Sequence, residues 1–315
     1  NIIDLTVIQQ YRVIEGSLTI NNTQLTRISL PNLESVGYIS VQTNVLLTRI
    51  DLPQLATIDG YFEFNNNTRL PSLNLPLLTS VGEYFQLGNH PRMSALSLPR
   101  LASVADFFRV TGVELLESAE GSFPALETVG GYLQWNSHGA LATLGDSFSR
   151  LRTVGGDADQ AANGYLRLYQ NHALVDLGTA FSRLESVFGP LAVYQHDALL
   201  EARFPALTTV GGHLSVGGNI RASDGNRSLR HIAFPALETV LGSCGTRGYP
   251  VECTVGHNVV LDISHNPALP ACLAQHYQNQ EVVDRNGRGI FQRNNRNGCD
   301  CALEDGEMRG TCPDD

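Results

Sequence analysis

The sequence predicts a mostly β protein that forms a single parallel β-solenoid of about ten turns. Three observations lead to this fold class. A short phrase, [LF]-P-x-L-x-x-[VI], recurs along the chain. Most copies are followed by a glycine and then by alternating hydrophobic and polar residues, the pattern of a strand with one buried face. A unit of 22 to 25 residues cannot bury its own apolar face, so successive units must stack.

The phrase occurs nine times, and in two of these copies serine replaces the proline. The spacings from one start to the next are 22, 23, 23, 25, 25, 33, 23 and 30 residues. The two longest gaps contain insertions, around Asp157–Asn163 and Ala222–Ser228. The copies begin at Leu30, Leu52, Leu75, Leu98, Phe123, Phe148, Phe181, Phe204 and Phe234.

Stacking at a strand spacing of about 4.8 Å turns each repeated hydrophobic position into a buried ladder. The leucine ladder comprises Leu33, Leu55, Leu78, Leu101, Leu126, Leu151, Leu184, Leu207 and Leu237. The second ladder comprises Val36, Ile58, Val81, Val104, Val129, Val154, Val187, Val210 and Val240.

Two polar positions also repeat. Asparagine or histidine follows each strand, and we interpret these residues as corner residues that hydrogen-bond to turn backbone, in preference to catalytic groups or metal ligands. They are Asn44, Asn67, His90, His138, Asn171, His196, Asn219 and Asn266. Serine or threonine precedes each residue of the second buried ladder, from Ser35 to Thr239. An ice-binding array is an alternative, but the mixture of the two residue types favours an ordinary exposed hydroxyl ladder.

Composition narrows the function. The net charge of −10 argues against binding to nucleic acid, and no apolar run is long enough to span a bilayer. The chain begins at Asn1 without a charged-then-apolar leader, as a mature secreted chain or a trimmed chain would. We therefore expect a secreted or cell-surface protein.

The cysteines support an oxidising compartment, because their number is even and all lie in the last quarter of the chain. A zinc site is less favoured, because the cysteines lack paired C-x-x-C spacing. We expect three disulfides, one of them Cys244–Cys253, and a pairing of Cys272 with either Cys299 or Cys301. The six cysteines are Cys244, Cys253, Cys272, Cys299, Cys301 and Cys312.

The segment Val13–Ile20, with sequence VIEGSLTI, resembles the opening of a receptor L domain, the ligand-binding lobe of the insulin and epidermal growth factor receptors. The later LPxLxxVGGYL units are similar to those of fungal and bacterial extracellular repeat proteins. The resemblance covers roughly Asp4 to Gln280, and it implies a right-handed solenoid with leucine-rich-like turns and capped ends. The family has a cysteine where this chain has Tyr11 and Arg12.

The chain is divided into an N-terminal cap (1–12), a repeat domain (13–275) and a cysteine-containing tail (276–315). Asp4 is placed to N-cap a short helix through Tyr11, and a second short helix begins near Pro270, since proline is tolerated in a first turn. Such caps cover the end layers of a solenoid.

Catalysis is not expected. Glu63 and Asp106 lie at outward strand positions, but neither has an evident carboxylate partner for glycoside hydrolysis. The sequence lacks a Gly-x-Ser-x-Gly elbow, a phosphate loop and a His-Glu-x-x-His motif. We predict no cofactor and no metal, and a polysaccharide-active enzyme remains the less favoured alternative.

Binding of a protein or glycan has more support, because three outward columns combine aromatic rings with amide, guanidinium and carboxylate groups. The first column is Tyr38, Tyr61, Tyr84, Phe107, Tyr132, Tyr165, Pro190 and His213. The second is Ser40, Glu63, Gln86, Arg109, Gln134, Arg167, Ala192 and Ser215. The third includes Gln42, Asn65, Thr111, Asn136, Tyr169 and Tyr194.

The predicted ligand surface is solvent-exposed, and Phe107 is its most telling residue, because an exposed phenylalanine invites a partner. The alternative is a structural or adhesion protein without a small ligand, in which the rings only stabilise adjacent strands. The predicted ligand-binding residues are Tyr61, Glu63, Tyr84, Gln86, Phe107, Arg109, Tyr132, Gln134, Tyr165, Arg167 and Tyr169.

Overall fold

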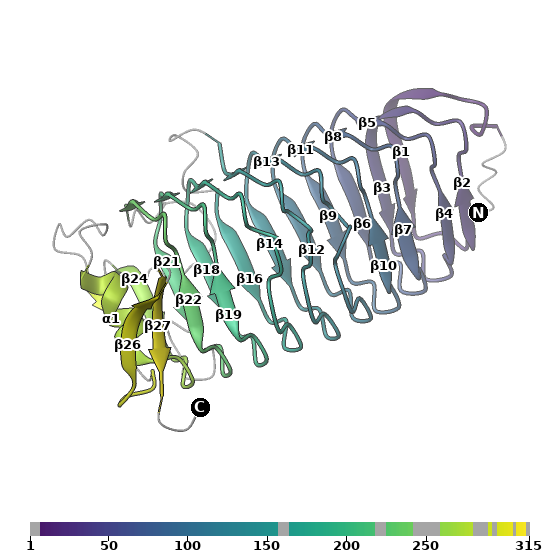
Figure 1. The fold of residues 1–315 in the computed structure, drawn as a ribbon. Coiled ribbons are helices and arrows are strands. Elements are labelled where there is room, and N and C mark those ends of the chain that lie inside the picture. The colour runs from purple at the N-terminus through teal and green to yellow at the C-terminus, as the bar shows by residue number, and fades with distance from the viewer. Residues whose placement is uncertain are drawn as a thin grey trace. The chain divides into compact units, whose positions relative to one another are not determined.

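The computed structural model describes residues 7–156, 164–217, 225–241, 259–279, 289–291, 295–304 and 307–312. The predicted fold class is confirmed: the protein is mostly β and forms a parallel β-solenoid, with about nine turns against the ten expected. The chain divides into two compact units. Figure 1 labels their helix and many of their strands. Unit 1 is Asn1–Leu151 with Gly178–Ala180, and unit 2 is Arg152–Leu177 with Phe181–Asp315.

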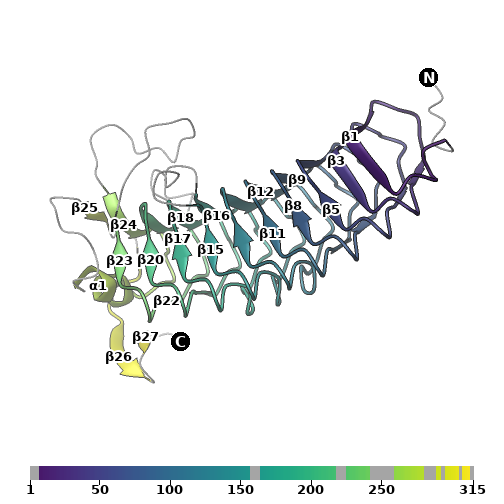
Figure 2. The ribbon, with the colours of Figure 1, turned by 90° about the horizontal axis from the view of Figure 1, so that it is seen from above.

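Three sets of short strands run along the coils, and we call them faces A, B and C. Face A consists of two-residue strands with a hydroxyl residue outward and a valine or isoleucine inward, as in the register pair Ser103↔Thr128. In unit 1 these are β5 (Thr57–Ile58), β8 (Ser80–Val81), β11 (Ser103–Val104) and β13 (Thr128–Val129). In unit 2, where Figure 2 shows them in a row, they are β15 (Thr153–Val154), β17 (Ser186–Val187), β20 (Thr209–Val210) and β23 (Thr239–Val240).

Face B carries strands that are mostly four residues long, in which hydrophobic residues point inward and alternate with outward residues. In unit 1 these are β6 (Phe62–Asn65), β9 (Phe85–Gly88), β12 (Phe108–Thr111) and β14 (Leu133–Asn136), preceded by the longer β1 (Val13–Asn21) and β3 (Ser35–Gln42). In unit 2 they are β16 (Leu166–Tyr169), β18 (Leu191–Tyr194), β21 (Leu214–Gly217), β24 (Val259–Ser264) and β25 (Gly289–Phe291).

Face C was not foreseen from the sequence, because its three-residue strands carry too short a pattern. Each has an apolar residue at its centre, such as Ile28 in β2. In unit 1 the strands pair as β2 (Arg27–Ser29) with β4 (Arg49–Asp51), and β7 (Ser72–Asn74) with β10 (Ala95–Ser97). In unit 2, β19 (Glu201–Arg203) pairs with β22 (His231–Ala233).

The core lies between the faces, and both predicted hydrophobic ladders are buried throughout. Phenylalanines reinforce it in unit 1, where Phe62, Phe85 and Phe108 stack with ring centroids 4.6 and 4.9 Å apart. Phe123 meets Phe108 edge-on at 4.9 Å, and Phe148 stacks on Phe123 at 5.7 Å. These rings have almost no solvent exposure, so the core of unit 1 is an interlocked aromatic cluster.

The asparagine and histidine positions form a buried corner ladder, as predicted. The side-chain oxygen of Asn44 accepts the Thr23 N–H (3.0 Å), and its amide donates to the Ile20 carbonyl (2.7 Å). Asn67 repeats both bonds one coil later, to the Asn44 N–H (3.0 Å) and the Val41 carbonyl (2.8 Å). Each ladder residue therefore joins adjacent coils.

The backbone just before the ladder is left-handed, which is costly for residues other than glycine. Thr43, Gln170 and Gln195 have φ values of 55°, 55° and 59°, and Gly112 fills the same place in another coil. The ladder compensates for this cost because its side chains bond the turn backbone on both sides. The corner geometry therefore depends on the ladder as well as on the turn sequence.

The last part of the ladder corrects one prediction. Asn219 lies outside the described residues, and Asn226 occupies a ladder position instead. Its side-chain oxygen accepts the His196 N–H (3.1 Å), and its amide donates to the Val193 carbonyl (3.0 Å). The insertion that precedes Asn226 lengthens this coil, so constant spacing from the strand is a poor guide to the corner residue.

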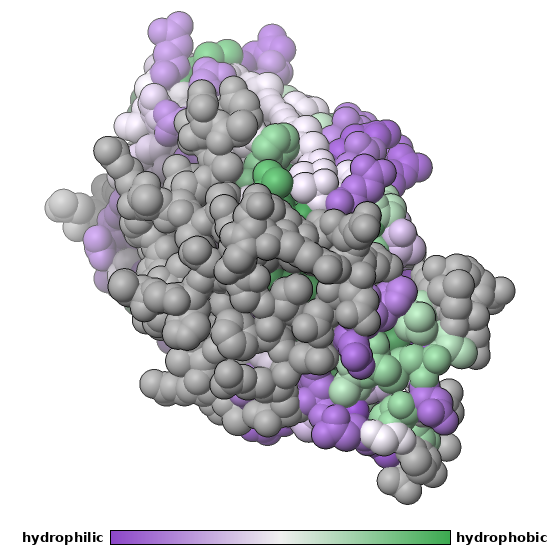
Figure 3. All heavy atoms as spheres, turned by 90° about the vertical axis from the view of Figure 1, so that its left-hand side faces the viewer, coloured by the Kyte–Doolittle hydropathy of each residue, from purple (hydrophilic) through white to green (hydrophobic). Residues whose placement is uncertain are grey.

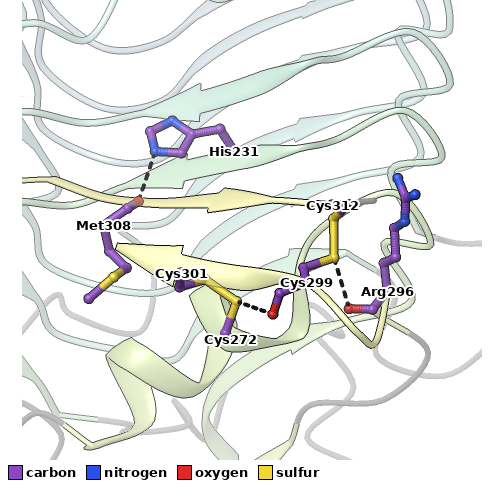
Figure 4. Close-up of a disulfide and its surroundings, with 7 residues drawn as sticks. All are labelled: His231, Cys272, Arg296, Cys299, Cys301, Met308 and Cys312. Atoms are coloured by element: carbon purple, nitrogen blue, oxygen red, sulfur yellow. Dashed lines mark hydrogen bonds between the residues drawn. A yellow bond between two sulfur atoms is a disulfide. The ribbon is translucent and has the colours of Figure 1, made fainter. Parts of the chain in front are cut away.

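The C-terminal cap consists of the predicted helix, α1 (Ala271–Asn279), and an antiparallel hairpin of β26 (Asp300–Glu304) and β27 (Glu307–Thr311). Cys272–Cys301 joins the helix to the hairpin, which is one of the two predicted pairings, and Cys299–Cys312 joins the residue before β26 to the residue after β27 (Figure 4). Cys244 and Cys253 lie outside the described residues.

The hairpin contacts face C of unit 2 through His231, which donates from Nε2 to the Met308 carbonyl (3.2 Å; Figure 4). The other ring nitrogen, Nδ1, lies 2.6 Å from Glu201, and this contact lowers the pKa of the Glu201 carboxyl. Figure 3 faces the side that carries α1 and the hairpin, and its described hydrophobic residues appear in small groups among hydrophilic ones.

Replacing Cys299 and Cys312 together by serine should loosen the hairpin without unfolding the coils, because closing a loop of this size contributes about 3 kcal/mol. We expect faster tryptic cleavage after Arg309 and an unchanged far-ultraviolet circular dichroism spectrum. Equal cleavage rates in the variant and the wild type would show that the hairpin does not depend on this disulfide.

At the other end, the predicted N-terminal helix is not formed over its described part. Residues 7–10 form turns, and the proposed N-cap residue Asp4 lies outside the described residues. Tyr11 and Val13 are exposed here, at 47% and 53%. The helix prediction rested on a single cap residue and two apolar positions, which is too little to distinguish a helix from successive turns.

Candidate functional site

The predicted ligand residues of unit 1 lie in register on face B, and we call them the unit 1 strip. Strand pairing aligns Glu63, Gln86, Arg109 and Gln134 in one column. The aromatic residues that precede the same strands form a second column beside it. The strip comprises Tyr61, Glu63, Tyr84, Gln86, Phe107, Arg109, Tyr132 and Gln134.

The aromatic column is a continuous stack of rings. The centroids of Tyr61 and Tyr84 are 4.9 Å apart, those of Tyr84 and Phe107 are 4.5 Å apart, and those of Phe107 and Tyr132 are 4.7 Å apart, all within 5° of parallel. Tyr38 extends the stack at 5.1 Å, with its ring tilted by 48°. The inner rings therefore cover each other's faces and present their edges outward.

This stacking corrects the interpretation of Phe107. It is half-buried between the rings of Tyr84 and Tyr132, so its presence on the outward face is explained in part by packing. A phenylalanine inside such a stack stabilises neighbouring strands whether or not a ligand is present. The aromatic column thus has a structural role, and recognition by the strip must rest on its polar groups as well.

Glu63 is held in a polar network at one end of the strip. Its carboxylate accepts hydrogen bonds from Gln42 (2.7 Å) and Asn65 (3.0 Å). Burial raises the pKa of Glu63, and the bond from Asn65 partly opposes that rise. Burial, together with the nearby Glu63, also raises the pKa of Tyr84 to about 12, so the phenol remains a hydrogen-bond donor at neutral pH.

Arg109 lies at the centre of the strip and is partly exposed. Its Nε is buried, and within the part of the chain that the structure describes it has no hydrogen-bond partner. Its strand neighbours in the column are the amide side chains of Gln86 and Gln134, which carry no charge to pair with the guanidinium. A buried donor without a partner is costly.

Two of the predicted residues are not exposed, contrary to the prediction. Gln134 is 6% exposed and donates to the side-chain oxygen of Asn136 (2.9 Å). In unit 2, Tyr165 is also 6% exposed, and the guanidinium of Arg167 lies 4.5 Å from its ring centroid. Both side chains occupy outward strand positions, but local packing covers them, which alternation alone does not reveal.

The remaining predicted residue, Tyr169, lies in unit 2 and is partly exposed. It stacks on Tyr194 with centroids 5.1 Å apart and rings within 4° of parallel. The predicted site residues therefore fall into two groups, with eight in unit 1 and three in unit 2.

The described residues contain no group of three or more histidine, cysteine, aspartate or glutamate side chains placed to hold a metal ion. No helix among them has both the length and the hydropathy of a membrane span.

Comparison with known proteins adds no further assignment: the chain matches no family model, no curated protein and no solved structure. The fold and the C-terminal disulfides define the class of protein instead. It is a parallel β-solenoid whose C-terminal hairpin is fastened by two disulfides.

Proposed function

We propose that this protein is an extracellular, non-catalytic recognition protein, and that the unit 1 strip binds a protein partner. The observation that carries the proposal is the Arg109 guanidinium, which is centred on the strip and whose buried Nε lacks a partner among the described residues. The rings of Tyr84 and Tyr132 precede the strands on either side of it, and tyrosine and arginine are enriched at binding hot spots.

Ring geometry favours a protein over a glycan at this strip. A sugar stacks on the face of an aromatic ring, whereas the inner rings here cover each other's faces at 4.5–4.9 Å. The exposed ring edges suit apolar side chains and carbonyl groups, because the edge of an aromatic ring is electropositive. The partner we propose places a carboxylate or a main-chain carbonyl against Arg109 and apolar side chains against the ring edges.

Secretion is part of the proposal. The disulfides Cys272–Cys301 and Cys299–Cys312 are the kind of bond that persists in oxidising compartments. They agree with an extracellular location for the strip and for its partner.

Changing Arg109 to glutamine should weaken partner binding at least tenfold, because a central charged hydrogen bond is lost, with little change in folding. The measurement is a titration against an array of extracellular proteins, using wild type, R109Q and, as a matched control, R100Q. Arg100 is an exposed arginine of unit 1 outside the strip.

The proposal is overturned if R109Q binds array proteins as tightly as R100Q does. It is also overturned if the wild type binds only to a parallel glycan array. A lower melting temperature of R109Q with unchanged binding would support a purely structural strip.

A further inference from the structure

Unit 2 contains a second polar group that the recognition role of unit 1 does not use. His213 is 4% exposed, and neither of its ring nitrogens has a hydrogen-bond partner among the described residues. It occupies the column that holds tyrosine or phenylalanine in unit 1. An apolar ring would pack at this position without burying an unpaired polar atom, whereas histidine buries two ring nitrogens. Buried side-chain nitrogens normally find partners, so this unpaired histidine requires an explanation, which a bound ligand would supply.

Arg167 is the charged group that acts electrostatically on this histidine. Its guanidinium lies 4.5 Å from the ring centroid of Tyr165, and its charge contributes, after burial, to lowering the pKa of His213 to about 4. His213 is therefore neutral near pH 7, with one N–H donor and one acceptor nitrogen. Arg167 makes no hydrogen bond or ion pair with the described residues.

The strand register explains why these two side chains act on each other. Arg167 in β16 is aligned with Ala192 in β18, which is aligned with Ser215 in β21. Unit 1 holds longer Glu63, Gln86 and Arg109 side chains in the equivalent column, whereas the next two strands after Arg167 carry the small Ala192 and Ser215. No long side chain of this column stands between Arg167 and the strand that carries His213.

We propose that Arg167 and His213 bind a small carboxylate that carries a neighbouring hydroxyl group. The arginine fork matches the two oxygens of a carboxylate, and the neutral imidazole can donate to the ligand while accepting from its hydroxyl. Acidic sugars and simple α-hydroxy acids share this chemistry. Ser215, a hydroxyl residue two strands from Arg167 in the same column, offers a further polar contact.

The test is a titration of the full chain with D-glucuronate, glycolate and the uncharged D-glucose, followed by the imidazole NMR signals of His213. We expect at least one of the two acids to shift these signals and D-glucose to leave them unchanged. Saturation by glucuronate alone identifies an acidic sugar, whereas saturation by glycolate identifies a simple hydroxy acid.

R167Q should weaken binding of the acid at least tenfold, while R183Q, at an exposed arginine of unit 2 outside this column, should bind it as the wild type does. H213F should also weaken binding while remaining folded, because aromatic rings occupy this column elsewhere. The proposal is overturned if neither acid binds, if glucose binds equally well, or if R167Q retains the wild-type affinity. Because R109Q is the variant that tests the unit 1 strip, failure of either proposal leaves the other standing.

Discussion

Replacing Phe108 by alanine should destabilise the protein by about 3–5 kcal/mol, the usual range for a large buried aromatic residue. Phe108 has no solvent exposure and contacts the rings of Phe85, Phe123 and Phe148, so its removal leaves a cavity that several rings line. The measurement is the free energy of unfolding from a urea titration.

Phe107 is the matched control, because it is adjacent in sequence but points to the other side of face B. It is half-buried and stacks on two rings, so F107A should cost about 1–2 kcal/mol, a typical value for two aromatic contacts. Similar losses in the two variants would mean that the outward stack carries as much stability as the core. That result would weigh against the recognition role of the strip.

Acid should destabilise this protein well before its carboxylates titrate. Burial lowers the pKa of His138 to about 3 and that of His196 to about 4, whereas an unfolded histidine titrates near 6.5. Below pH 6.5 the unfolded chain binds more protons than the folded one, so the stability that these residues provide is present above pH 6.5 and is lost as the pH falls. At pH 5, each of the two histidines should lower the free energy of unfolding by on the order of 2 kcal/mol relative to its value above pH 6.5.

The substitutions H138N and H196N test this origin, since asparagine holds the same ladder position in other coils. Between pH 7.5 and pH 5, the free energy of unfolding measured in urea should fall less in the double variant than in the wild type. H172N is the control, because His172 is exposed and pairs with Asp197 (2.9 Å). If H138N/H196N loses as much stability between the two pH values as the wild type does, other groups cause the acid sensitivity.

Features that recur in every coil could be predicted from the sequence. The leucine and valine ladders, the hydroxyl strands of face A and the corner ladder each repeat often enough that one exceptional coil does not obscure the pattern. The Cys272–Cys301 bond was one of the two expected pairings of Cys272, although the spacing of the cysteines did not decide between them.

Features that differ from coil to coil could not be predicted. Gln134 and Tyr165 are at outward positions by alternation, but their burial depends on neighbours that vary between coils. Asn226 took the ladder position that the spacing assigned to Asn219, because an insertion lengthens its coil. His213 was visible as a break in the aromatic column, but only the structure shows that its ring nitrogens are unpartnered among the described residues.

The burial of Asn226 has a consequence for the choice of expression host. Asn226-Arg227-Ser228 is an acceptor sequence for N-linked glycosylation, and the glycan would be attached to the nitrogen that donates to Val193. That nitrogen lies in a side chain with no solvent exposure, so an oligosaccharide added to the nascent chain would prevent this corner from closing. In a eukaryotic secretory pathway, glycosylation of Asn226 therefore competes with burial of its side chain, and so with the folding of unit 2.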